Sequence, residues 1–215
     1  MTSYYNIYPK FLVSVDCIIF GFSEGTLKLL IQKRPYNPGL GMWSLIGGFV
    51  EQDESIDSSA QHVLTKFTGL HNIYMRQLEA FGEVERDPGQ RVISIVYYAL
   101  INMNNCINNM PKEYDAKWVD IDKVPHLCFD HNKMVDKARK KISEGLLDEP
   151  ICSNLLPRFF TLSQLQSLHE SIMGVSIDKR NFRRSIAEKK YVVKTEMIDK
   201  GNSRRGASLY EFCSE

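Results

Sequence analysis

The chain has 215 residues, of which 43% are hydrophobic and 25% charged, as is typical of a soluble globular protein with a sizeable core. Lys and Arg number 27 against 26 Asp and Glu, and the five cysteines lack C-x-x-C spacing, which excludes an evident zinc site or disulfide framework. The longest apolar stretch, residues 11–22, is interrupted by Asp16 and too short to span a bilayer. With no secretion signal, a cytoplasmic location is expected.

The first 150 residues show the pattern of an α+β domain. Six segments are rich in β-branched and aromatic residues and are predicted to be strands: residues 11–21, 26–33, 43–50, 74–84, 91–101 and 118–121. Helical spacing covers residues 54–67, which end before Gly69, and residues 130–143. Strands and helices do not alternate as in βαβ units, so a regular parallel sheet is not expected.

Residues 149–154 break this pattern and divide the chain into a domain of residues 1–150 and a domain of residues 151–215. The second domain is predicted to contain a helix over residues 161–173, a helix over residues 178–190, and a hairpin of residues 191–198 and 207–212. Thr161 is placed to cap the first helix and Gly174 to end it. Helix, turn, helix and β-hairpin is the order of a winged helix.

Charge is divided unevenly between the two parts. Residues 1–154 carry 16 Lys and Arg against 19 Asp and Glu, whereas residues 155–215 carry 11 against 7. A basic C-terminal quarter behind an acidic body favours contact of that quarter with a polyanion, although a solvated basic face would give the same counts.

The helix over residues 178–190 is predicted to present its basic face to DNA. Phe182 and Ile186 share one side and can enter a core, while arginines and Ala187 occupy the other. A small residue lets the backbone approach a groove, and guanidinium groups can reach phosphates or guanine edges. Together with the hairpin tip, the candidate DNA-binding residues are Lys179, Arg180, Asn181, Arg183, Arg184, Lys200, Arg204 and Arg205.

Residues 48–70 resemble the Nudix box, G-x5-E-x7-R-E-U-x-E-E-x-G-U, at the correct overall spacing. The positions kept are Gly48, Glu54, Leu64, Gly69 and Leu70. The positions of the box arginine and of the three glutamates after it hold His62, Val63, Lys66 and Phe67. The resemblance implies a loop–helix–loop whose glutamates hold magnesium against a pyrophosphate.

These replacements predict a domain without catalytic residues, metal or cofactor. Magnesium prefers carboxylate and phosphate oxygens, and Lys66 would repel it. Without the metal, neither the attacking water nor the leaving phosphate is activated. Glu51, Asp53 and Glu54 lie nearby, so an alternative metal site, and with it an active pyrophosphatase, stays open.

Both halves together resemble the Nudix-related transcriptional regulators, whose named branches are the NrtR and AraR types. Further segments that carry the resemblance are residues 118–125, 129–131, 156–166 and 178–184. It implies a Nudix-fold α/β/α sandwich with a mixed sheet, followed by a winged helix-turn-helix domain. It also implies a homodimer, away from membranes, that binds a palindromic DNA operator and responds to a small effector.

The effector is the open question of this resemblance. AraR-type members respond to L-arabinose and control pentose use, and overall similarity favours this branch and a role in carbohydrate metabolism. NrtR-type members respond to ADP-ribose and control nicotinamide cofactor genes, which is the alternative. A module that binds RNA or protein is a third possibility.

Candidate effector contacts follow from the chemistry of the ligand. A neutral pentose requires an aromatic wall and a few hydrogen-bonding groups, whereas ADP-ribose requires cations for its pyrophosphate. The candidate effector-binding residues are Arg34, Trp43, Glu51, Phe81 and Glu83.

Overall fold

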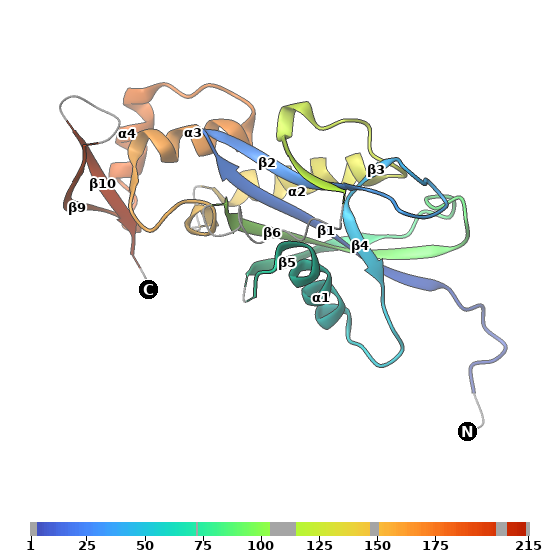
Figure 1. Cartoon of the computed structure of the whole chain (residues 1–215). Helices are drawn as coiled ribbons and strands as arrows, with labels where there is room; N and C mark the ends of the chain where they lie inside the picture. The colour runs from blue at the N-terminus through green and yellow to red at the C-terminus, as the bar shows by residue number, and fades with distance from the viewer. Residues whose placement is uncertain (1–3, 72, 104–114, 147–150, 201–205, 214–215) are drawn as a thin grey trace.

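The computed structural model describes residues 4–71, 73–103, 115–146, 151–200 and 206–213. The N-terminal domain is a mixed sheet with a long helix on each face, and the C-terminal domain is a small helical unit with its own sheet (Figure 1). The strands of the large sheet are β1 (Leu12–Ser23), β2 (Thr26–Lys33), β3 (Trp43–Ser44), β4 (Ile46–Phe49), β5 (Tyr74–Phe81), β6 (Val92–Asn102) and β7 (Ala116–Asp120). Its helices are α1 (Ile56–Thr68), α2 (His131–Gly145) and the short 3-10 helix η2 (Ile121–Lys123).

Strand β1 organises the large sheet. It pairs in parallel with β6 from Leu12 opposite Val92 to Phe22 opposite Asn102, and antiparallel with β2 and β4. The strand order is β3-β2-β1-β6-β5, with β4 added to β1 and β7 to β2. Because both faces of β1 are covered, its Val, Ile and Phe run is almost continuous instead of alternating.

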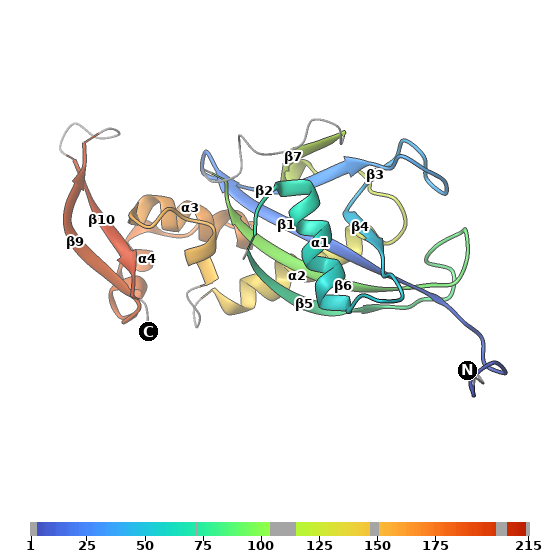
Figure 2. The ribbon, with the colours of Figure 1, turned by 60° about the horizontal axis from the view of Figure 1, so that its bottom comes forward.

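The two faces of the sheet form separate hydrophobic cores. Helices α1 and α2 lie on opposite faces, which makes the domain a sandwich (Figure 2). Helix α1 covers one face through Ala60, Leu64 and Phe67. Helix α2 covers the other through Met134 and Ala138, both fully buried. The Nudix-type α/β/α sandwich with a mixed sheet that the sequence predicts is confirmed.

The C-terminal domain has the element order of a winged helix. It comprises β8 (Phe160–Thr161), α3 (Leu162–Met173), α4 (Lys179–Ala187), β9 (Val192–Asp199) and β10 (Ala207–Phe212), with β10 between β8 and β9 in a three-stranded sheet. The second helix ends at Ala187, three residues before the predicted end.

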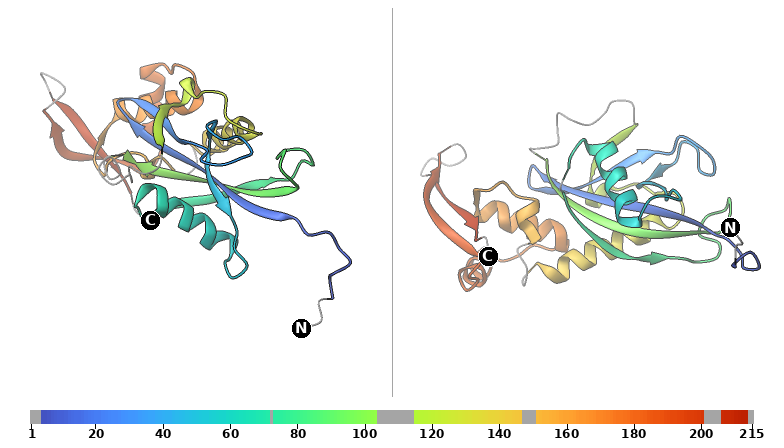
Figure 3. Two further views of the ribbon diagram at one scale, coloured as in Figure 1. Left: turned by 45° about the vertical axis from the view of Figure 1, so that its right-hand side comes forward. Right: turned by 90° about the horizontal axis from the view of Figure 1, so that it is seen from below.

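The two domains share one core. The cluster beneath α2 continues through Leu146, Leu155 and Leu156 into α3, where Leu165 and Leu168 belong to it. The predicted linker is thus partly structural: its residues 151–154 form the 3-10 helix η3 (Ile151–Asn154), in which Ile151 and Cys152 are buried, and residues 147–150 lie outside the described part. Figure 3 shows the C-terminal domain beside one end of the large sheet.

The predicted strand over residues 43–50 is divided in the structure. Ser44 and Trp43 pair with β2, whereas the segment from Ile46 pairs with β1, so the chain changes partner at Leu45. Among the described residues, no helix has the length and apolar character needed to cross a bilayer.

Candidate effector and DNA-binding sites

The helix of the box motif, α1, begins and ends at residues suited to those positions. Ser55 is the N-cap, and its hydroxyl accepts a hydrogen bond from the amide of Ser58 at 3.1 Å. Gly69, at the C-cap, has a φ of 69° and donates its N–H to the carbonyl of Thr65 at 2.8 Å. Gly69, a position of the box that this chain keeps, therefore marks the end of the helix, and Ser55, directly after Glu54, marks its start.

The side chains at the glutamate positions of the box do not suit a divalent ion. Val63 and Phe67 are 9% and 6% exposed and pack in the core beneath α1. Lys66 is exposed, and Glu54 pairs with His62, which stands in the place of the box arginine. Magnesium prefers oxygen ligands, so this donor set does not fit it. Within the described ranges, no three His, Cys, Asp or Glu side chains converge to form a metal site.

A cavity of about 600 Å³ lies between α1 and the segments that flank β4. Its apolar wall includes Tyr36, Phe49 and Phe67, and its charged side chains include Glu51 and Lys66. Small-molecule sites have volumes of roughly 300–1,000 Å³ and mostly apolar walls with a few polar groups. The cavity is therefore large enough for a nucleotide-sized ligand.

A narrower pocket of about 40 Å³ adjoins this cavity, and the two share the backbone at Gly47 and Gly48. Arg34 lines the narrow pocket. Its Nε donates to the carbonyl of Pro38 at 2.8 Å, and its guanidinium lies 4.7 Å from the ring centre of Tyr36 and 4.9 Å from that of Phe129. One hydrogen bond and two aromatic rings thus fix the orientation of a cation in the pocket wall.

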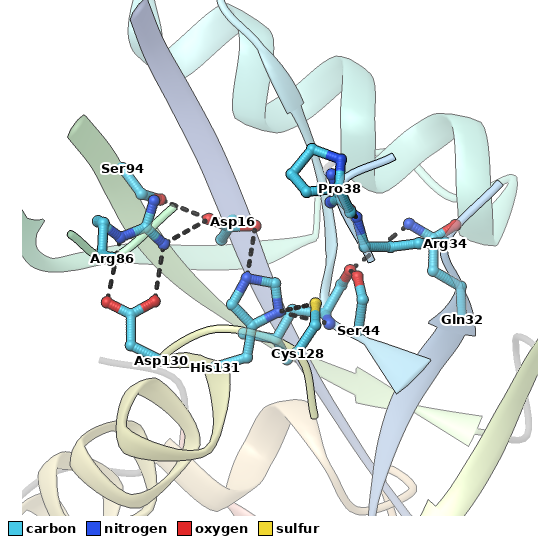
Figure 4. A network of polar contacts seen from close by, with 11 residues as sticks. Asp16, Gln32, Arg34, Pro38, Ser44, Arg86, Ser94, Cys128, Asp130 and His131 are labelled. Carbon is cyan, nitrogen blue, oxygen red and sulfur yellow. Dashed lines mark hydrogen bonds and ion pairs between the residues drawn. The ribbon is translucent and has the colours of Figure 1, made fainter. Parts of the chain in front are cut away.

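A buried polar network forms the back of the narrow pocket (Figure 4). The Arg86 side chain, 3% exposed, donates to both carboxylate oxygens of Asp130 at 2.8 and 3.1 Å. It also lies 3.8 Å from Asp16, whose Oδ2 accepts a hydrogen bond from the Ser94 hydroxyl at 2.6 Å. Pairing of this kind is what allows charges to remain buried.

His131 completes the network. The amide of Leu45 donates to Nδ1 at 3.1 Å, so the neutral ring carries its proton on Nε2, which lies 3.8 Å from Asp16 Oδ1. Burial lowers the pKa of His131 below its usual 6.5, so the ring is neutral at pH 7. The first residues of α2 are therefore tied to the pocket wall without adding a charge.

The five candidate effector-binding residues do not lie together. Arg34 lines the narrow pocket and Glu51 the larger cavity. Trp43, Phe81 and Glu83 line neither pocket. The Trp43 ring is covered by Lys117 at 4.0 Å, Phe81 is 9% exposed beneath Lys137, and the exposed Glu83 offers its carbonyl to Arg91. 

In the C-terminal domain, α3 begins with a capping box. The Thr161 hydroxyl accepts from the amide of Gln164 at 3.2 Å, and the Gln164 side chain accepts from the amide of Thr161 at 2.8 Å. The predicted N-cap at Thr161 is confirmed, and Gly174 ends the helix in the left-handed conformation.

Helix α4 separates an apolar face from a basic face. Phe182 and Ile186 are 4% and 3% exposed and pack in the core, as the helical spacing predicts. The Asp178 carboxylate accepts from the amide of Asn181 at 2.8 Å and caps the helix. The candidate DNA-binding residues that the structure describes are all exposed: Lys179, Arg180, Asn181, Arg183, Arg184 and Lys200. Arg204 and Arg205 lie outside the described residues.

Models of two families match the chain, one to each domain. Residues 10–143 match the NUDIX domain, and residues 152–212 match the NrtR DNA-binding winged helix domain. Fold and site thus define a two-domain class of protein in which a Nudix domain with a ligand-sized cavity is joined to a DNA-binding type of winged helix.

Relatives along the full length identify the family. The chain is 32% identical over 209 residues to the "ADPR responsive transcriptional repressor NtrR" of Acinetobacter baylyi, covering 95% of this chain and 83% of that one. It superposes on the crystal structure of Shewanella oneidensis NrtR complexed with a 27mer DNA with a TM-score of 0.82 and 29% identity over 94% and 93% of the two chains. The chain belongs to the NrtR family of Nudix-related transcriptional regulators.

The N-terminal domain alone is also similar to a ligand-bound structure. It matches the NUDIX domain of Shewanella oneidensis NrtR complexed with ADP ribose, with a TM-score of 0.58 and 28% identity over 66% of this chain and 94% of that one. These comparisons support the NrtR branch and give no support to the arabinose branch that overall similarity favoured, so L-arabinose and sugar utilisation are not retained.

Sequence reasoning missed the buried network as a site. Asp16, Arg86 and Asp130 are far apart in the chain, and the three do not form a motif with recognisable spacing. The only available signals were an aspartate inside a strand of apolar residues and the match of residues 129–131 to the family.

Proposed function

We propose that the chain is a transcriptional repressor whose Nudix domain binds ADP-ribose and thereby changes the affinity of its winged helix for an operator. The observation that carries this proposal is the joining of the exposed basic face of α4 to a domain with a cavity of about 600 Å³. Arg34, held in one orientation in the adjoining pocket, supplies the cation that a pyrophosphate requires. The names of the relatives point to the same effector and the same action.

The proposed partners are a second copy of the chain and a palindromic DNA operator. Two copies of the chain would place two α4 helices on the half-sites of a palindromic operator. Genes of nicotinamide cofactor metabolism are the expected targets, because ADP-ribose is a fragment of that cofactor. The effector must bind the DNA-bound and DNA-free arrangements unequally, since equal affinity would shift neither.

Operator binding by variants of α4 tests the DNA-binding part. Fluorescence anisotropy with a labelled duplex from upstream of the chain's own gene is expected to show salt-dependent binding that Arg180→Ala and Arg184→Ala each weaken by about tenfold or more. Lys133→Ala, an exposed cation on α2, is the matched control and should leave the affinity unchanged. Equal affinities for all four proteins would contradict the assignment of α4 as the recognition helix.

A second candidate function is hydrolysis of ADP-ribose, because Glu51, Asp53 and Glu54 all line the cavity. Carboxylates together with substrate phosphates can bind magnesium. We expect no turnover, since Val63, Lys66 and Phe67 cannot supply the ligands that the box provides in hydrolases. The test incubates the protein with ADP-ribose and magnesium and measures AMP by chromatography. Release of AMP would show that the domain hydrolyses ADP-ribose and would contradict the proposed role as an effector-binding repressor.

A further inference from the structure

Helix α2 contacts both the narrow pocket and the winged helix. It begins at His131, which lines the pocket, and it follows Asp130, which binds Arg86 of the pocket wall. Eight residues after His131, about 12 Å further along the axis at 1.5 Å per residue, Arg139 contacts the C-terminal domain. The helix, yellow in Figure 3, runs along the sheet toward that domain. Its buried side chains, among them Met134 and Ile142, pack in the core that the two domains share.

All three side-chain nitrogens of Arg139 are hydrogen-bonded, two of them to the end of α3. Nε donates to the carbonyl of Ile172 at 2.8 Å, and Nη2 donates to the carbonyl of Ser171 at 2.7 Å. Nη1 bonds to Asp122 of the N-terminal domain at 3.0 Å. One guanidinium therefore connects the N-terminal domain to the last turn of the first helix of the winged helix.

The hydrogen bonds of Arg139 are directional, unlike the apolar packing that makes up most of the joint. The core shared by the two domains is apolar, and burial of apolar surface does not depend on orientation. The last carbonyls of a helix, by contrast, have no partner within the helix and carry partial negative charge. The contact is also close: a Cβ at Gly174 would lie 3.1 Å from Nη2 of Arg139. The hydrogen bond from the amide of Leu27 to Ser171 Oγ, at 2.7 Å, is a second directional contact at the same turn.

We propose that Arg139 is the positioning residue through which occupancy of the Nudix pocket sets the orientation of the winged helix. A ligand that contacts the pocket wall displaces the His131 end of α2, the helix moves as a rigid unit, and Arg139 moves the end of α3 with it. This inference rests on the proposed function for its effector. It adds the residue that carries the signal, which lies in neither the pocket nor the basic face of α4.

A thermodynamic cycle on full-length protein tests the coupling. The operator Kd is measured with and without saturating ADP-ribose, and allosteric proteins commonly show ratios of about 5- to 150-fold. We expect Arg139→Gln to bring this ratio to within about twofold of unity, while its ADP-ribose Kd without DNA stays within about threefold of wild type because Arg139 is outside the pocket. Arg139→Lys, which keeps the cation, should retain part of the ratio. Lys140→Gln, a substitution of the exposed neighbour, should retain all of it. A wild-type ratio in Arg139→Gln would overturn the proposal.

A distance measurement without effector separates this inference from the proposed function. Spin labels at the exposed positions Asp136 on α2 and Glu188 after α4 report the arrangement of the two domains. Arg139→Gln is expected to broaden the distribution of distances between them, and Lys140→Gln to leave it as narrow as in wild type. A narrow distribution in Arg139→Gln would sink the positioning role even where ADP-ribose acts on operator binding. A different outcome is that ADP-ribose leaves the operator affinity of the wild type unchanged while Arg139→Gln still broadens the distribution of distances. That outcome would contradict ADP-ribose as the effector and support the positioning role of Arg139.

Discussion

Gly47 lies where β4 passes closest to Asp16 of the buried network. A Cβ at this position would be 2.5 Å from Asp16 Oδ1 and 2.6 Å from the carbonyl of Val15, closer than real contacts allow. We expect Gly47→Ala to lower the free energy of unfolding by about 1–3 kcal/mol, as overpacking does, measured by urea denaturation. Gly82→Ala is the control, because its Cβ would meet no atom within 4 Å. Equal losses in the two variants would show that the close approach is not tight in solution.

Arg34 is the residue on which recognition of the effector is expected to depend most. Its guanidinium is already oriented by Pro38, Tyr36 and Phe129, so little side-chain entropy is lost when it binds a phosphate. Arg34→Ala should weaken ADP-ribose binding by about tenfold or more in calorimetry, corresponding to about 1.4 kcal/mol for the loss of a charge-assisted contact. Lys33→Ala removes the neighbouring exposed cation and should change little. A larger loss of ADP-ribose affinity in Lys33→Ala than in Arg34→Ala would show that the pyrophosphate does not bind at the narrow pocket.

At the scale of single residues, the sequence predicted the exposed basic residues of α4 better than it predicted the residues that line the pockets. The basic residues of α4 could be predicted because helical spacing alone separates them from Phe182 and Ile186. Residue type alone does not place Trp43 and Phe81, because an aromatic ring suits a core as well as a pocket. Whether any of the candidate residues contacts effector or DNA stays a prediction.

The core of the winged helix contains a titratable group that makes its stability depend on pH. His169 on α3 lies edge-on to Phe182, with ring centres 5.2 Å apart, and burial lowers its pKa from 6.5 to about 4. The unfolded chain therefore binds a proton between these pH values and the folded chain does not, so stability is complete above pH 6.5 and falls as the pH decreases toward 4.

We expect this group to contribute a slope of up to about 1.4 kcal/mol per pH unit in that interval, measured by urea unfolding from pH 7 to pH 4.5. His169→Leu should reduce the slope, and the remaining slope should include His131, whose pKa is also lowered by burial. An unchanged slope in the variant would show that His169 is not neutral in the folded state.

The elements themselves were predictable, and so was the pairing of β9 with β10 in a hairpin, but strand partners distant in the chain were not. Runs of Val, Ile and Phe and the glycines at positions 69 and 174 locate β1, α1 and α3 to within a few residues. The parallel pairing of β1 with β6 joins segments about 80 residues apart in the chain, and no local pattern encodes it. The change of partner at Leu45 has the same origin, because β-strand propensity does not specify which strand is the neighbour.

The molecule as a whole is expected to unfold as one unit. Its largest core extends from β1 and α2 through Leu155 into α3, so removal of either domain would expose apolar surface of the other. Differential scanning calorimetry should give one transition with equal calorimetric and van't Hoff enthalpies. Two separate transitions would show that the shared core contributes less than each domain's own packing.

The apolar side chains of Val63 and Phe67 attach α1 to the sheet without any counter-ion. Two carboxylates at the same places would repel each other unless a cation were bound between them. The contact of α1 with the sheet at these two side chains therefore needs no divalent ion. We expect the domain to keep this packing whatever the magnesium concentration around it.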